Sequence, residues 1–182
     1  MKKVFMLAMV AIMTLAVSQK AQAIEDPNPK GTFVLGIRGG LYPGFGANVV
    51  ADYTLVDSWW KGHFTVGAYA GFNNRHYHYD YSYYAYRSNY MNFAVMPRVT
   101  YGLNITKQFE VHVGVMAGMN FQVNKWVYDG GYADTETYSH FYFSHGEAVG
   151  ARYMFSEKFG AEVEFVYSGY QSYLNAGITL KL

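Results

Sequence analysis

The sequence predicts one all-β domain, an eight-stranded antiparallel up-and-down transmembrane β-barrel. Three observations lead to this fold class. Apolar and polar residues alternate with a period of two along eight segments, most connectors are alternately short and long, and aromatic residues cluster at the ends of the apolar face.

The clearest strand begins at Phe109. One face carries Phe109, Val111, Val113, Val115, Ala117, Met119, Phe121 and Val123. The intervening residues are polar or small apart from Met116. A two-residue repeat of this length excludes an amphipathic helix, because helical side chains return to one face every 3.6 residues.

The same test gives eight strands in all. They cover residues 32–42, 46–55, 63–73, 89–104, 109–126, 140–155, 160–169 and 173–182. Short turns are expected at 57–62, 105–108 and 156–159, and longer loops at 74–88 and 128–139. The connectors at 43–45 and 169–172 are short on the side where the others are long. Strands of about ten residues match a tilted bilayer crossing.

The composition of each face decides between a membrane barrel and a soluble lipocalin-like barrel. The polar face is rich in Gly and Asn, including Gly36, Asn48, Gly67, Gly114 and Asn120, whereas a face in water is normally rich in Lys and Glu. Small polar residues therefore indicate a crowded interior. The aromatic residues at the strand ends are typical of the two interfacial belts of outer-membrane barrels.

The N-terminus is expected to be removed. Residues 1–23 contain a basic start, an apolar run and the small-residue pattern Ala21-Gln22-Ala23, which predict a signal peptide. The alternative is an uncleaved membrane anchor, although the apolar run is short for a spanning helix. Residues 24–31 would form a short periplasmic segment and 32–182 the barrel.

Charge content gives no indication of nucleic-acid binding, and cysteine content excludes disulfides. Residues 1–23 hold three of the 14 Lys and Arg residues and none of the 13 Asp and Glu residues, so the mature chain would have a net charge of −2. No basic patch suggests nucleic-acid binding. The chain has no cysteine, so burial and backbone pairing must stabilise it without disulfides.

Charged side chains within the strands fall mostly on the inward face. They are Arg38, Arg98, Arg152 and Lys181, and Asp52, Glu110, Glu162 and Glu164. Equal numbers of each sign allow complete pairing, which predicts a salt-bridged, closed interior. The alternative is a conducting interior, but an eight-stranded barrel is just wide enough for side chains to fill. His112 follows Glu110 on this face, as a structural histidine or a general base.

Two polar residues break the alternation. The alternation places the side chains of His145 and Glu147 on the outward, otherwise apolar face, so they lie at the loop-side rim or a β-bulge turns them inward. A lipid A-modifying hydrolase could use Ser144, His145 and Glu147 as nucleophile, base and orienting group. Ser144 and His145 are adjacent on a strand and point to opposite faces, so we expect no enzyme.

Residues 75–90, RHYHYDYSYYAYRSNY, lie between two predicted strands. His76 and His78 share one face and, with Asp80, form a weak metal motif; we expect no metal and no cofactor. The opposite face carries Tyr77, Tyr79, Tyr81 and Tyr83, which suit a contact surface. We therefore interpret 75–90 as a continuation of the flanking strands above the membrane.

The C-terminal third carries a family resemblance. The runs VGARYMFSEKFGAEVEFVYSG and YLNAGITLKL resemble the small outer-membrane β-barrel family of Bacteroidetes-type bacteria, similar to the OmpX and OmpA barrels, most strongly over 146–182. The resemblance implies assembly by the outer-membrane barrel machinery, contact with lipid and lipopolysaccharide, and a monomer in the outer membrane of a Gram-negative cell.

The expected function is structural and surface-interacting. The four middle strands and their loops are longer than the others, so one wall of the barrel should rise above the membrane as a sheet that can bind an extracellular protein partner. The alternatives are a narrow channel or carrier for small apolar solutes and, more remotely, the lipid A-modifying hydrolase.

Overall fold

The predicted eight-stranded antiparallel up-and-down barrel is confirmed. The computed structural model describes residues 27–41, 44–59, 62–81, 84–129, 135–168, 171 and 173–182. Their strands are β1 (Phe33–Leu41), β2 (Phe45–Trp59), β3 (Gly62–Tyr81), β4 (Tyr84–Asn104), β5 (Phe109–Asp129), β6 (Thr135–Met154), β7 (Phe159–Tyr167) and β8 (Leu174–Lys181). Each strand pairs antiparallel with its sequence neighbour, and β1 pairs with β8, so the sheet closes into a barrel.

The ends of the chain complete the closure. Phe33 and Leu182 exchange backbone hydrogen bonds of 3.3 and 2.8 Å across the β1–β8 seam. The predicted signal peptide, residues 1–23, lies outside the described residues, as do residues 24–26. No helix among the described residues is long and apolar enough to cross a membrane.

Two turns at one end of the barrel share a local geometry. In the β4–β5 turn the Thr106 hydroxyl accepts a hydrogen bond from the Phe109 N–H at 2.9 Å. In the β6–β7 turn the Ser156 hydroxyl accepts one from the Phe159 N–H at 3.1 Å. Side-chain hydroxyls of this kind stabilise tight turns by satisfying backbone donors.

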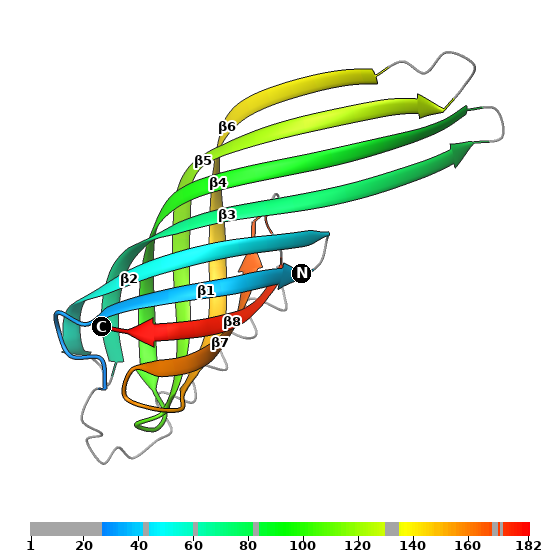
Figure 1. Cartoon of the computed structure of the whole chain (residues 1–182). Helices are drawn as coiled ribbons and strands as arrows, with labels where there is room; N and C mark the ends of the chain where they lie inside the picture. Colours follow the sequence, from blue (N-terminus) through cyan, green and yellow to red (C-terminus); the bar gives the residue numbers. More distant parts are fainter. Residues whose placement is uncertain are drawn as a thin grey trace.

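The four middle strands are longer than the segments predicted for them, and the difference is largest for β3. β3, β4, β5 and β6 have 20 or 21 residues, whereas β1, β7 and β8 have 8 or 9. Figure 1 shows these strands continuing past the rest of the barrel as a curved sheet. We call this sheet the extension: residues 75–81 of β3, 84–91 of β4, 122–129 of β5 and 135–140 of β6.

The extension corrects the two predicted loops. Residues 74–88 and 128–139 are mostly strand, with pairs such as His76↔Asn89 and Lys125↔Thr137. The loop prediction is wrong because polar and aromatic residues predominate on both faces of the extension, so the apolar–polar contrast weakens while backbone pairing continues. The interpretation of 75–90 as continued strands is confirmed for residues 75–81 and 84–90, which are the part of this range that the structure describes.

Alternation sorts the side chains between the two faces of the barrel. Inward side chains are buried and include an apolar layer of Val50, Tyr69, Ala94, Met96, Met116, Ala148 and Val166. Outward side chains are apolar yet exposed, as for Val99 and Val115. The apolar residues therefore lie mainly on the outside of the barrel, and the charged residues on the inside.

Candidate functional site

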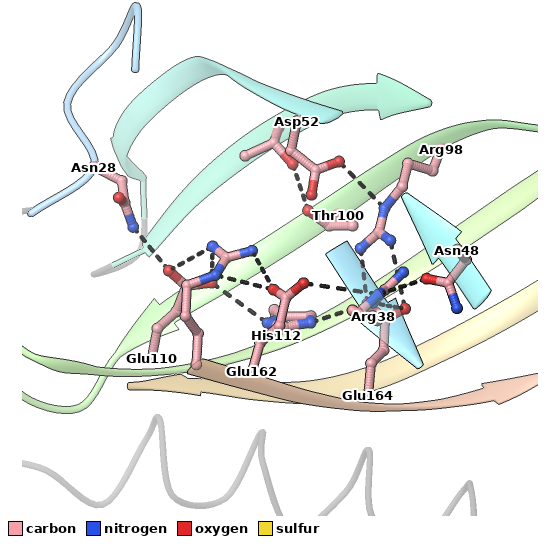
Figure 2. A network of polar contacts seen from close by, with 12 residues as sticks. Asn28, Arg38, Asn48, Asp52, Arg98, Thr100, Glu110, His112, Glu162 and Glu164 are labelled. Atoms are coloured by element: carbon pink, nitrogen blue, oxygen red, sulfur yellow. Dashed lines mark hydrogen bonds and ion pairs between the residues drawn. The ribbon is translucent and has the colours of Figure 1, made fainter. Parts of the chain in front are cut away.

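The barrel interior contains a cluster of buried ion pairs. Seven of the eight charged residues with inward parity are buried: Arg38, Asp52, Arg98, Glu110, Arg152, Glu162 and Glu164. They come from six strands, and all of them except Arg152 are labelled close together in Figure 2. We call these seven residues the interior cluster.

Glu164 is the centre of the cluster. Its Oε1 lies 2.6 Å from Nη1 of Arg38, and its Oε2 lies 2.9 Å from Nη2 of Arg98. Nε2 of His112 lies 3.1 Å from the same Oε2. Asp52 shares Arg98, with Oδ1 at 3.2 Å from Nε. One carboxylate thus compensates two buried guanidinium groups.

A second set of ion pairs in the interior cluster follows directly from the strand register. Glu110 on β5 is opposite Arg152 on β6, which is opposite Glu162 on β7. Arg152 Nη1 lies 3.3 Å from Glu110 Oε1, and its Nη2 lies 3.1 Å from Glu162 Oε2. Directly opposed residues on adjacent strands are near enough to pair, so this geometry follows once the strands are aligned.

Two histidines join the cluster. His112 lies between carboxylates, with Nδ1 at 3.4 Å from Glu110 Oε1 and Nε2 at 3.1 Å from Glu164 Oε2. This position supports the structural interpretation of His112. His63, which sequence reasoning missed, lies 3.7 Å from Glu110. The sequence did indicate that His63 occupies an inward-facing position of β3.

Glycines make room for these long side chains. A Cβ atom on Gly36 would collide with the Glu162 carboxylate, and one on Gly150 with the His112 ring. The abundance of glycine on the inward face is therefore steric, since larger residues would displace the ion pairs.

An amide side chain from outside the strands lies near each end of the interior. At the turn end, Asn28 Nδ2 donates to Glu110 Oε2 at 2.8 Å (Figure 2). At the other end, Gln171 accepts from the Tyr69 hydroxyl and donates to Asn120, both at 3.2 Å. Both amides are buried and both lie outside strands, so the two-residue repeat gave no signal for them.

Lys181, the eighth residue with inward parity, lies at the turn end. Its ammonium donates to the Pro27 carbonyl at 2.6 Å. Lys181 therefore ties the N-terminal segment to β8 close to the end of the interior.

The residues considered for an enzyme point in different directions. Ser144 is buried and accepts a hydrogen bond from Asn120, whereas His145 is exposed on the outward face. Glu147 is half-buried on the outward face and is opposite Tyr167 at the end of β7. The register through His145 and Glu147 is continuous, so the alternative of a bulge is wrong and both side chains keep the outward-facing positions that the alternation predicts.

The inner face of the extension is aromatic. Ring centroids are 5.5 Å apart for Tyr77 and Tyr90 and 6.1 Å apart for Tyr90 and Trp126. Of the other predicted contact tyrosines, Tyr79 and Tyr81 pair with Tyr86 and Tyr84 through the backbone. Tyr83 lies outside the described residues.

The weak metal motif lies on the outer face of the extension. His76 and His78 are exposed, and His76 Nε2 lies 3.3 Å from the Asn74 amide nitrogen. Over the described ranges, no group of three or more His, Cys, Asp or Glu side chains is arranged to hold a metal ion.

A row of phenylalanines marks the base of the extension. Phe72, Phe93, Phe121 and Phe141 are successive partners across β3, β4, β5 and β6 on the outward face. Their neighbouring ring centroids are 5.0, 6.5 and 4.6 Å apart. Phe141 is 73% exposed, so this contiguous ring surface is unlike the surface of a protein that meets only water.

No protein-family model matches the chain, and no curated protein matches it. Among solved structures, it is similar to the attachment invasion locus protein Ail of Yersinia pestis, described in complex with the heparin analogue sucrose octasulfate. That match has a TM-score of 0.48 and 12% identity and covers 84% of this chain and 96% of Ail.

Two further structures have similar coverage. The N-terminal barrel of Pseudomonas aeruginosa OprF has a TM-score of 0.45 and 14% identity, covering 84% of this chain and 98% of that one. Neisserial surface protein A has a TM-score of 0.41 and 14% identity, with the same coverage. At these identities the likeness concerns the fold alone.

Proposed function

We propose that the protein is an integral outer-membrane barrel, closed to solutes, that presents the extension outside the cell as a contact surface. The observation that carries this proposal is the continuation of β3–β6 beyond a barrel whose interior is filled by ion pairs. The barrel would anchor the protein in the membrane, and the extension would make the contacts with other molecules.

The outward face supports a lipid environment. Val99, Val115 and Phe143 are 46%, 61% and 70% exposed. Large exposed apolar surfaces are costly in water but favourable in a bilayer. The backbone groups of a closed barrel are paired between strands, which a lipid environment requires.

The filled interior supports a closed barrel. The interior cluster, the apolar layer and the amides of Asn28 and Gln171 are all buried in the interior. Separating the buried ion pairs to open a path would leave charges without compensation. Passage of solutes and catalysis therefore have no part in the proposed function.

The strand edges of the extension support binding of a partner. Within the described pairings, β3 beyond Asn74 pairs only with β4, and residues 135–146 of β6 pair only with β5. Residues Thr135–Ser144 contain no Lys or Pro, residues that commonly protect an edge from strand addition. An extracellular protein could add a strand there, with the tyrosines as a contact face.

The remaining features complete the proposal. Residues 1–23 would be cleaved after export, 24–31 would remain in the periplasm, and the barrel machinery would insert 32–182. The mature protein would be a monomer without a cofactor, surrounded by lipid and lipopolysaccharide, and would not bind nucleic acid.

Shortening the extension tests this function. A variant in which Asn-Gly turns replace residues 76–89 and 125–137 keeps the barrel register, so it is expected to fold and insert as well as the intact chain. Folding is measured by the mobility shift of unheated against heated samples on gels. Contact is measured by aggregation of cells producing the protein and by their adhesion to heparin-, collagen- and fibronectin-coated surfaces.

The expected result is that cells with the intact chain aggregate or adhere more than cells without it, and that the shortened chain loses this gain while remaining folded. If the intact chain confers neither property, the contact function is wrong. If the shortened chain cannot fold, the extension serves the barrel itself.

A further inference from the structure

The outer face of the extension carries positive charge next to the lipid-facing surface. Two register rows cross it: His76–Asn89–Lys125–Thr137 and His78–Arg87–Val127–Thr135. Arg87 and Lys125 are thus diagonal neighbours on adjacent strands, where side chains start about 7–8 Å apart. Two long cationic side chains at that spacing can converge on one anion.

These residues line an open pocket of about 320 Å³. Its lining includes His76, His78, Arg87, Asn89, Lys125 and Val127. The guanidinium of Arg87, the ammonium of Lys125, the amide of Asn89 and the imidazoles of His76 and His78 all supply N–H hydrogen-bond donors. Such a set of donors suits a phosphate group, which Arg binds through a planar pair of N–H groups.

The height of the pocket above the barrel indicates the source of the phosphate. Lys125 follows Phe121 by four residues on the same face, about 13 Å along a strand. If the Phe72–Phe93–Phe121–Phe141 row meets the outer edge of the hydrocarbon, the pocket lies at the level of lipid headgroups and their first sugars. This step depends on the proposed membrane location.

We propose that this pocket binds a phosphate group of a glycolipid headgroup in the outer leaflet. The contact would fix the extension against the membrane surface, with its aromatic inner face and strand edges left available to a partner. This inference deepens the proposed function and rests on it.

The test compares two double variants of the full chain, purified and folded in detergent. R87Q/K125Q removes two positive charges from the pocket, and K107Q/K158Q removes two from the exposed turns at the opposite end. Dissociation constants are measured by microscale thermophoresis for lipid A with two phosphates, for the same lipid A after phosphatase treatment, and for inorganic phosphate.

R87Q/K125Q is expected to bind phosphorylated lipid A about tenfold more weakly than the wild type and the K107Q/K158Q control. Phosphatase-treated lipid A should bind all three proteins alike. Equal affinity of both double variants for phosphorylated lipid A would overturn the site, and inorganic phosphate binding as tightly as lipid A would overturn the lipid source.

Folding and location are checked separately. Single K125Q, a milder change at an exposed position, replaces the double variant if the latter lacks the gel mobility shift, and should weaken binding about threefold. Fractionation of cells shows whether the chain is in the outer membrane. Absence from that membrane contradicts the proposed function, whereas correct location with unchanged lipid affinity contradicts only the phosphate site.

Discussion

Glu164→Ala is expected to lower the free energy of unfolding by about 3–5 kcal/mol, the cost of removing one partner from a buried ion pair. Glu164 is fully buried and contacts Arg38, Arg98 and His112. Its removal leaves two guanidinium groups in the interior, with only Asp52 and Glu162 near enough to offset them. Glu164→Gln should have a smaller effect, because it keeps the shape and part of the hydrogen bonding.

Equilibrium unfolding in urea from lipid vesicles measures the change, with Glu157→Gln as control. Glu157 is exposed in the β6–β7 turn, so removing its charge should change stability by less than about 0.5 kcal/mol. If the Glu164→Ala variant were as stable as the control, the ion pairs of the interior cluster would not stabilise the folded barrel.

Val99→Arg is expected to lower the free energy of unfolding by about 2–4 kcal/mol, because an arginine on the lipid face is unfavourable near the middle of a bilayer. Val99 is 46% exposed on the outward face of β4, and its partners across the sheet are Val66 and Val115. No acidic side chain is directly opposite it. The expected result is weaker insertion and lower stability in vesicles.

Thr137→Arg is the matched control for this substitution. Thr137 is exposed on the same outward face but lies in the extension, where an arginine meets water or headgroups. It should change stability by less than about 0.5 kcal/mol. Equal effects of the two substitutions would favour a barrel whose outer face meets water throughout.

Most of the barrel could be predicted because a buried face and a lipid face impose strict alternation. The ends of the strands at the turns were predicted to within a few residues, and parity alone placed Arg38, Glu110 and Glu162 inside. Alternation has less meaning in the extension, where the inner-face positions carry mostly Tyr and Trp and the outer-face positions carry mostly polar residues such as His, Thr, Ser, Arg and Lys, so neither face is consistently apolar. There the strands are defined by pairing across the sheet, which a single sequence does not reveal.

The parts of the interior that sequence reasoning missed come from outside the alternating pattern. Asn28 precedes β1 and Gln171 follows β7, so neither had a parity that could place it inside. His63 had inward parity, but nothing local indicated that Glu110, distant in sequence, would be near it. These contacts depend on the closure of the barrel, which brings strands distant in the chain together.

The central claim is a membrane-spanning barrel with the extension outside the cell, and cysteine labelling tests it most directly. The chain has no cysteine, so Lys125→Cys, Val99→Cys and Lys107→Cys each supply one reporter. With a membrane-impermeant maleimide, position 125 should react on intact cells and position 107 only after the outer membrane is permeabilised. Position 99 should react only after denaturation. Labelling of position 99 to the same extent as position 125, or equal labelling of 107 and 125 on intact cells, would contradict the claim.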